Sequence, residues 1–302
     1  MKQLVILSGK GGTGKTSVAA SFAHLASAGP ALVRAVVADA DVDAANLELL
    51  LQPRVLEEHD FVGGSLAVID PALCSGCGVC AEVCRFDAII VPYAGTADAY
   101  QVDPIACDGC AACVYQCPDQ AIRMEPQTVG RWFRSDTRYG PLFHAALRPA
   151  QENSGKLVTE VRKEARLRAL VDGAHVILDG PPGIGCPVIS AATGSDLALI
   201  VAEPSAAGVH DMERALQTVS HFRIPALVCI NKADIYPDGA AQIEDYCRAH
   251  DVDVVGRIPF DSAVAHAIVH GQPVTAYAPD APASQAIAAI WQAVAPRLRE
   301  DS

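Results

Sequence analysis

Two groups of residues in this 302-residue sequence have the types and spacing needed for chemistry: a glycine-rich loop near the N-terminus and a set of clustered cysteines. The loop reads Gly9-Lys-Gly-Gly-Thr-Gly-Lys-Thr16. It follows an apolar run at residues 2–7 and precedes a helical pattern that extends to about residue 28. Glycines let successive N–H groups turn inward, and a helix start favours negative charge, so this arrangement predicts a phosphate-binding loop.

The loop residues predict that the ligand is a nucleoside triphosphate bound together with Mg²⁺. Lys15 is expected to reach the β- and γ-phosphates, and the Thr16 hydroxyl to ligate Mg²⁺. The residues expected to contact the nucleotide here are Gly11, Gly12, Thr13, Gly14, Lys15, Thr16 and Ser17.

Eight of the eleven cysteines form two runs of identical spacing. The runs read Cys74-x2-Cys77-x2-Cys80-x3-Cys84 and Cys107-x2-Cys110-x2-Cys113-x3-Cys117-Pro118. They are offset by 33 residues, and the match extends outward, since Asp-Pro precedes and Ala-Ile follows both runs. The segment is therefore a duplicated unit.

This spacing is that of the bacterial ferredoxins, in which each run wraps three corners of a [4Fe-4S] cluster and its fourth cysteine crosses to the other cluster. One cluster is then expected on Cys74, Cys77, Cys80 and Cys117, and the other on Cys84, Cys107, Cys110 and Cys113. Arg85 replaces the usual proline after the first run but leaves the ligands whole. Zinc usually takes two separated pairs of ligands, so it fits this spacing poorly. Clusters that only stabilise the segment are a second alternative; use in redox chemistry or cluster handling is favoured.

Charge and hydropathy exclude several classes of partner. The chain has 23 basic and 35 acidic residues, a net charge of −12, which argues against nucleic acid and anionic membranes. Residues 70–125 carry eight acidic and two basic residues, which favours a basic docking partner. No apolar run approaches the roughly 18 residues of a membrane-spanning helix, so we expect no membrane insertion and a cytoplasmic protein.

The remaining apolar runs alternate with helical patterns, which predicts an α/β fold with a doubly wound, mostly parallel sheet. Strands are expected at 2–7, 33–38, 175–178, 197–201, 226–230 and 252–255, with helices at 209–221 and 239–250. A last amphipathic helix at 284–298 could anchor to a membrane, but packing on the sheet is favoured. The arginines and aromatics of 128–144 are interpreted as a hairpin with a solvated face rather than a binding surface.

The loop with Lys10 resembles the deviant Walker A motif of the MinD/ParA/Mrp/nitrogenase-iron-protein superfamily. Further segments resemble that superfamily's switch and base-binding motifs, namely Asp39-Ala-Asp-Val-Asp-Ala-Ala-Asn46, Asp179-Gly-Pro-Pro-Gly183, Asn231-Lys-Ala-Asp234 and Ile258-Pro-Phe-Asp261. The cysteine repeat lies between the two switch motifs, as in the MinD-superfamily ATPases with an inserted ferredoxin domain. We therefore expect an ATPase domain at 1–56 and 156–302, an inserted α+β domain with two [4Fe-4S] clusters at 66–126, and a connecting hairpin at 127–155.

The resemblance implies an ATP-dependent homodimer, or a heterodimer with a paralogue. It implies that Lys15 holds phosphates in its own subunit, that Lys10 reaches the nucleotide across the interface, and that Asp41 positions the attacking water. It further implies that Asp179 holds Mg²⁺ through water, that the Gly183 backbone contacts the γ-phosphate, and that Asn231 lies beside the base. Asp43 is interpreted as a loop or capping acid.

The expected cofactors are ATP or ADP, Mg²⁺ and two [4Fe-4S] clusters. The expected function is nucleotide-gated electron transfer through the clusters to a protein partner, or support of iron–sulfur or metal cofactor assembly. The alternative is a MinD/ParA-type positioning ATPase with a redox-sensing insert. Cys229 and Cys247 are interpreted as apolar filler, and Cys186, beside the second switch motif, supplies too few ligands for a cluster on a dimer axis.

Overall fold

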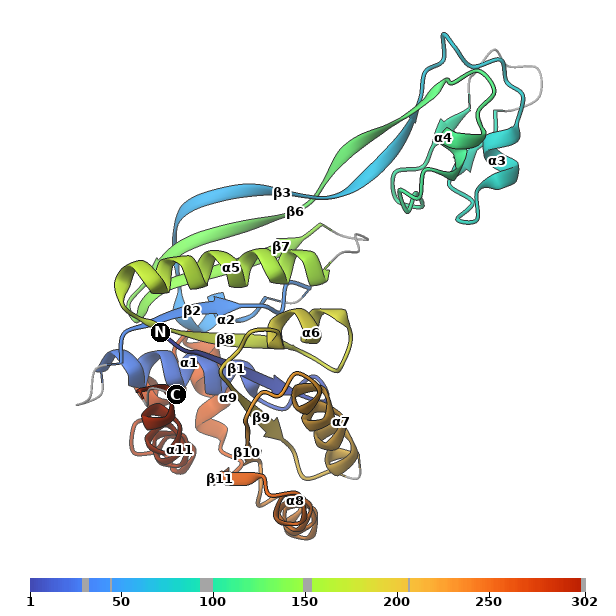
Figure 1. Ribbon diagram of the computed structural model, residues 1–302. Helices are drawn as coiled ribbons and strands as arrows, with labels where there is room; N and C mark the ends of the chain where they lie inside the picture. Colours follow the sequence, from blue (N-terminus) through green and yellow to red (C-terminus); the bar gives the residue numbers. More distant parts are fainter. Residues whose placement is uncertain (29–32, 44, 93–99, 149–153, 206, 300–302) are drawn as a thin grey trace. The chain divides into compact units, whose positions relative to one another are not determined.

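The computed structural model describes residues 1–28, 33–43, 45–92, 100–148, 154–205 and 207–299. It divides into two compact units (Figure 1). The first, here called the sheet unit, comprises Met1–His59, Trp132–Ala146 and Ser154–Ser302. The second, the cysteine unit, comprises Asp60–Arg131 and Leu147–Asn153.

The main sheet has the strand order β11-β10-β9-β1-β8-β2-β7-β6-β3. Its strands are β1 (Gln3–Ser8), β2 (Ala35–Asp39), β3 (Arg54–Ile69), β6 (Ile122–Thr137), β7 (Gly140–Leu147), β8 (His175–Pro182), β9 (Leu197–Ala202), β10 (Ala226–Asn231) and β11 (Asp253–Ile258). The pairs from β11 through β7 are all parallel. The expectation of a mostly parallel α/β sheet is therefore confirmed. The sequence patterns missed the long strand β3, whose alternating, mostly exposed residues lack an apolar run.

Helices cover both faces of this sheet (Figure 1). One face carries α1 (Lys15–Ala28), α2 (Leu47–Leu51), α9 (Ser262–Val269), α10 (Val274–Tyr277) and α11 (Pro282–Arg299). The other carries α5 (Ser154–Asp172), α6 (Cys186–Ala192), α7 (Gly208–His221) and α8 (Pro237–Ala249). Central strands such as β1 and β9 are buried along their whole length, because helices lie above and below them.

The C-terminal helix α11 packs into the core of the sheet unit. Ile287, Ile290 and Val294 are buried on it, and the Trp291 ring lies 4.9 Å from the Phe22 ring of α1. The predicted packing of this helix on the sheet is thus confirmed. Among the helices described, none has the length and apolar character to cross a bilayer.

The hairpin of β6 and β7 has a solvated, ion-paired face, as expected for 128–144. Within the sheet unit Arg134 pairs with Glu57, and Arg54 lies 4.0 Å from Asp136. These side chains are mostly exposed, so each pair is worth little to stability, about 0–1 kcal/mol. The arginines are occupied by acidic neighbours and do not form a free basic surface.

The cysteine unit repeats its own structure at the 33-residue offset. Helix α3 (Val79–Val83) carries the third cysteine of the first run, as α4 (Ala112–Gln116) carries the third cysteine of the second. Strand β4 (Ile89–Ile90) pairs antiparallel with β5 (Gln101–Val102). The Asp70 N–H donates to the Ala121 carbonyl, and the Asp103 N–H donates to the Ala88 carbonyl, both at 2.8 Å. Since each bond joins one repeat to the other, the unit has an internal two-fold arrangement.

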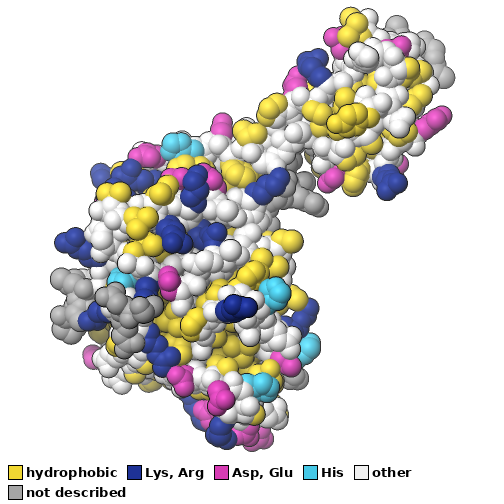
Figure 2. Space-filling view, in the orientation of Figure 1, with side chains coloured by type: hydrophobic (Ala, Val, Ile, Leu, Met, Phe, Trp, Pro, Cys, Tyr) yellow, Lys and Arg dark blue, Asp and Glu magenta, His cyan; other side chains and the backbone are white. Residues whose placement is uncertain are grey.

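The core of the cysteine unit is very small. Among the described residues its buried cluster holds only Ala67, Cys80, Ile89 and Ile122, with other cysteines packed against it. Large apolar side chains therefore remain at the surface, where Ile105 and Tyr115 are 70% and 86% exposed (Figure 2). A domain of this length with so little buried apolar surface is only weakly stable, unless a further group cross-links the chain.

Candidate nucleotide and iron–sulfur sites

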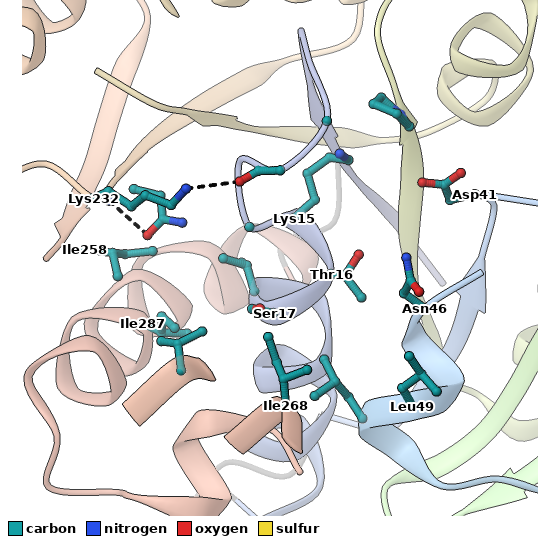
Figure 3. Close-up of a pocket in the computed structure, with 18 residues that line it drawn as sticks. Lys15, Thr16, Ser17, Asp41, Asn46, Leu49, Lys232, Ile258, Ile268 and Ile287 are labelled. Carbon is teal, nitrogen blue, oxygen red and sulfur yellow. Dashed lines mark hydrogen bonds between the residues drawn. The ribbon is translucent and has the colours of Figure 1, made fainter. Parts of the chain in front are cut away.

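The phosphate loop borders a cavity of about 410 Å³ at the carboxyl ends of the parallel strands (Figure 3). Such an edge is where open α/β sheets bind ligands. Of the residues predicted to bind nucleotide, those that line the cavity are Gly11, Gly12, Gly14, Lys15, Thr16, Ser17, Asp41 and Asn231. Lys10, Thr13, Asp179 and Gly183 lie outside its lining.

Gly14 makes possible a close contact between the loop and β10. Its φ is +95°, and a Cβ at this position would lie 2.3 Å from Nδ2 of Asn231. That amide donates to the Thr13 carbonyl at 2.7 Å, while its oxygen accepts from the Lys232 N–H at 3.0 Å. The amide nitrogen of Asn231, a residue expected beside the base, therefore holds the phosphate loop, while its oxygen is bonded to the neighbouring residue of its own segment.

The electrostatic centre of the site is a buried lysine among buried carboxylates. Burial lowers the pKa of Lys15, and the charges of Asp179, Asp41 and Asp39 oppose that shift. Burial raises the pKa of Asp179 to about 7, against the opposing effects of the Thr16 hydroxyl and Lys15. A triphosphate and a divalent cation are the charges that such a mixed set of groups can accommodate.

Asp179 has the properties expected of a Mg²⁺ site residue. It lies in β8 and is 1% exposed. Among the residues that the structure describes, no group meets the full hydrogen-bond geometry at either carboxylate oxygen, although the Thr16 hydroxyl lies near enough to lower the pKa of Asp179. A buried charged group without partners costs several kcal/mol, so an orphaned carboxylate beside a phosphate loop fits a cation or its bound water. Thr16 and Asp179 are therefore the residues that would hold Mg²⁺.

Asp39 is a site residue to which the sequence patterns assigned no role. Its fully buried carboxylate accepts the Asp41 N–H at 3.0 Å and the Leu47 N–H at 3.1 Å. Burial and the charge of Asp179 raise its pKa well above the usual range. Asp39 thus fixes both ends of the loop that presents Asp41. An acidic residue ending an otherwise apolar strand was the available signal.

Lys10 is held by its own chain in this structure. Its Nζ donates to the Ser205 hydroxyl at 2.9 Å and lies 3.4 Å from Glu203. Glu203 also accepts from Lys232 Nζ at 3.1 Å, and Lys232 donates to the Gly12 carbonyl at 3.2 Å. Burial would raise the pKa of Glu203, but Lys232 and Lys10 outweigh it, and the pKa is lowered. Lys10 must leave this contact before it can reach a nucleotide on another subunit.

The far side of the cavity is apolar and suits a planar base. Ile258, Ile268 and Ile287 line it from β11, α9 and α11, with Leu49 and Leu50 of α2 (Figure 3).

Gly183 lies beyond the end of β8, with φ of +89°, and its N–H donates to the Ser8 carbonyl at 3.1 Å. That hydrogen bond must break before Gly183 can donate to a γ-phosphate.

The cysteine unit brings the four cysteines of one predicted ligand group to a common pocket. One pocket is lined by Cys84 together with Cys107, Cys110 and Cys113, so the fourth cysteine of the first run lies at the second run. On the other side, Ser75 beside Cys74 is hydrogen-bonded to Asp119, two residues after Cys117. The Ala88 and Ala121 N–H groups donate to the Cys84 and Cys117 sulfurs at 3.4 and 3.3 Å. Such N–H···S bonds stabilise thiolate ligands, which fits iron–sulfur clusters.

These groups are not arranged for a single metal ion. Within the described part of the chain, no three His, Cys, Asp or Glu side chains converge on one point. A [4Fe-4S] cluster takes one thiolate at each of four irons, so its ligands surround a volume and do not meet.

The other three cysteines lie in the sheet unit. Cys229 and Cys247 are fully buried, and burial raises the pKa of their thiols to about 12 and about 11, which confirms apolar filler. Cys186 is exposed at the start of α6.

Comparison with known proteins decides the family. The CobQ/CobB/MinD/ParA nucleotide binding domain family matches residues 4–274. The chain belongs to this family. An uncharacterized protein of Methanocaldococcus jannaschii is 35% identical over 230 residues, 76% of this chain and 78% of that protein.

Two further comparisons show similarity to known proteins, one in fold and one in part of the sequence. The structure of MinD of Pyrococcus horikoshii in complex with Mg-ADP matches this one with a TM-score of 0.59 at 18% sequence identity. The match covers 97% of this chain and 95% of the MinD chain. An iron–sulfur cluster carrier protein of Aquifex aeolicus is 26% identical over 127 residues, 38% of this chain and 35% of that protein. The MinD/ParA resemblance expected from the motifs is thus confirmed for fold and family.

Proposed function

We propose that this chain is an ATP-hydrolysing iron–sulfur protein in which nucleotide in the sheet unit controls the use of two [4Fe-4S] clusters in the cysteine unit. The observation that carries the ATPase part is buried Lys15 surrounded by Asp39, Asp41 and Asp179 at a phosphate loop. That constellation supports phosphoryl transfer to water better than simple nucleotide storage, because it places carboxylates where a nucleophile must be oriented.

In this proposal the loop N–H groups and Lys15 hold the phosphates, and Thr16 and Asp179 hold Mg²⁺, whose charge neutralises the phosphate oxygens. Asp41 orients the attacking water, and Asp39 keeps Asp41 in position through the Asp41 and Leu47 N–H groups. Water adds to the γ-phosphorus while the bond to the ADP oxygen breaks, so the products are ADP and phosphate. Lys15, partly desolvated, stabilises the charge that develops on the bridging oxygen.

The chain's connectivity supports coupling to the clusters. Leu49 and Leu50 of α2 line the nucleotide cavity, and β3 begins at Arg54, only a few residues later. β3 then continues into the cysteine unit. A nucleotide-dependent change in α2 is therefore transmitted directly into the chain that leads to the cysteines.

The cysteine unit supports two uses of the clusters. Electron transfer is favoured by two adjacent ligand groups in one small unit, which is the arrangement of two-cluster ferredoxins. Delivery of a cluster is the second candidate, and the likeness to an iron–sulfur cluster carrier protein over 38% of this chain favours it. ATP would act through a dimer, of two copies or with a paralogue, in which Lys10 leaves Ser205 and Glu203.

The test uses anaerobically reconstituted full-length protein. We expect about eight irons and eight sulfides per chain, and Mg²⁺-dependent release of phosphate from ATP. Lys15→Ala should reduce turnover at least a hundredfold while the iron content stays unchanged. Lys163→Ala removes an exposed lysine paired with Glu160 on α5 and serves as the matched control. Absence of Mg²⁺-dependent turnover, or equal turnover in Lys15→Ala, would refute the ATPase assignment; fewer than four irons would refute the cluster assignment.

A further inference from the structure

The two ligand groups of the cysteine unit form a duplicated pair, and among the equivalent positions that differ between them, two decide whether the segments of a ligand group are hydrogen-bonded to each other. In the first group Ser75 lies beside Cys74, and Asp119 lies just after Cys117. At the offset of 33 residues, the equivalent positions in the second group are Asp108 beside Cys107 and Phe86 just after Cys84. These four residues are therefore a built-in comparison between two otherwise similar sites.

In the first group the two positions are joined. The Asp119 carboxylate accepts the Ser75 N–H at 3.2 Å and the Ser75 hydroxyl as well. The Ser75–Asp119 pair thus connects the loop that carries Cys74 and Cys77 to the segment that carries Cys117. Since Cys117 is the ligand that crosses from the other run, the pair holds together the two chain segments of one ligand group.

In the second group the two positions are not joined. Phe86 has no hydrogen-bonding side chain and is 44% exposed, and the Asp108 carboxylate makes no hydrogen bond to any residue the structure describes. Both residues instead border the pocket formed by Cys84, Cys107, Cys110 and Cys113. Gly109 of this loop does lie against the Ser65 carbonyl, where a Cβ would come within 2.4 Å. The loop thus passes close to β3, but this close approach does not link it to the segment that carries Cys84.

We infer that the two clusters differ in lability: the site of Cys84, Cys107, Cys110 and Cys113 is the one that releases its cluster first, and the Ser75–Asp119 pair makes the other site the retained one. The inference rests on the proposed binding of two clusters. Release of a cluster to a chelator would break the four iron–thiolate bonds and the iron–sulfide bonds of the core; protons from water would convert the thiolates to thiols and the sulfide to hydrogen sulfide, and the chelator would take the ferrous and ferric ions unchanged, so no oxidant or reductant is required. Opening of the ligand group limits this release, and a charged hydrogen-bonded pair opposes opening.

The experiment follows iron loss from the fully loaded, full-length protein in excess EDTA without oxygen, by cluster absorbance and by the iron that stays bound. We expect two phases of about four irons each, with the slow phase at least about tenfold slower, the factor that one charge-assisted hydrogen bond of about 1.4 kcal/mol supplies. Asp119→Ala should accelerate the slow phase until the phases merge. Glu82→Ala, which removes an exposed acidic side chain of α3 outside the pair, is the matched control and should keep both phases.

A reciprocal variant keeps the test independent of any damage caused by Asp119→Ala. Phe86→Asp combined with Asp108→Ser transfers the pair to the second group and should slow the fast phase about tenfold. One phase of eight irons in the unmodified protein, or two phases unchanged by Asp119→Ala, would overturn the inference while leaving the proposed function intact. A protein that loads no clusters would overturn both.

Discussion

The buried carboxylate of Asp179 should make the stability of the nucleotide-free protein fall as pH rises, and Asp179→Asn should weaken that dependence. Burial raises the pKa of Asp179 from 3.8 to about 7 in the folded state. Between about pH 4 and pH 7 the folded chain therefore keeps a proton that the unfolded chain has lost. Unfolding then becomes easier with rising pH, in total by about 4 kcal/mol for three pKa units at 1.36 kcal/mol each.

The variant carries a constant cost of its own. A buried amide without partners costs about 1–3 kcal/mol at every pH. Asp179→Asn should therefore be less stable than the unmodified protein near pH 4 and more stable by about 1–3 kcal/mol at pH 8, so that the two stability curves cross. Asp39 also has a raised pKa, partly because of the charge of Asp179, so its own contribution to the pH dependence becomes smaller in the variant and shifts the two curves in the same direction.

Urea unfolding followed by tryptophan fluorescence measures the difference in stability between the two proteins, and it reports on the sheet unit. Both tryptophans, Trp132 and Trp291, belong to the sheet unit, so the signal is separate from the cysteine unit. The titration is made without nucleotide and with EDTA, and then repeated with Mg²⁺ and ADP. Magnesium nucleotide should stabilise the unmodified protein above pH 7 and the variant far less. Stability curves that stay parallel from pH 4 to pH 8 would refute a buried, unpartnered Asp179.

Two further predictions concern the loops around the cavity. Gly14→Ala should lower nucleotide affinity at least tenfold in calorimetry, because its Cβ would meet the Asn231 amide at 2.3 Å and its φ is +95°. Gly11→Ala, which has no atom within 4 Å of its Cβ, should lower the affinity less. Equal losses of affinity in the two variants would contradict this explanation. Asp39→Asn leaves one of the two N–H groups, of Asp41 or Leu47, without its acceptor and so loosens the loop that carries Asp41. This variant should reduce kcat about tenfold with little change in KM. An unchanged kcat would show that the loop carrying Asp41 does not depend on this carboxylate.

Much of the fold was predictable because its signals are local. The buried strands β1, β8 and β9 are continuous apolar runs, and the phosphate loop is a contiguous motif, so spacing alone located them. The cysteine repeat was equally visible, since identical spacing at a fixed offset needs no tertiary information. The long strand β3 left no such signal, because its residues are mostly exposed and its partner β6 lies more than 50 residues away.

The parts of the site that could not be predicted depend on contacts between distant segments. The motif indicated a base-binding role for Asn231, which stays a prediction, but it gave no sign that the amide also donates to the Thr13 carbonyl 218 residues away. Glu203 carried no motif, yet it pairs with both Lys10 and Lys232. The role of Asp39 depends on two N–H groups whose direction only the folded loop sets. Side chains that position others are thus invisible to spacing patterns, whereas side chains that belong to a motif are not.

The most direct test of nucleotide control over the clusters is the reduction potential of each cluster, measured anaerobically without nucleotide, with ADP and with a non-hydrolysable ATP analogue. The analogue should shift at least one potential by more than about 30 mV, which corresponds to more than half a kcal/mol of coupling per electron. Lys15→Ala should abolish the shift. Potentials that stay the same in all three states, with nucleotide shown to be bound, would contradict thermodynamic coupling between the nucleotide cavity and the clusters.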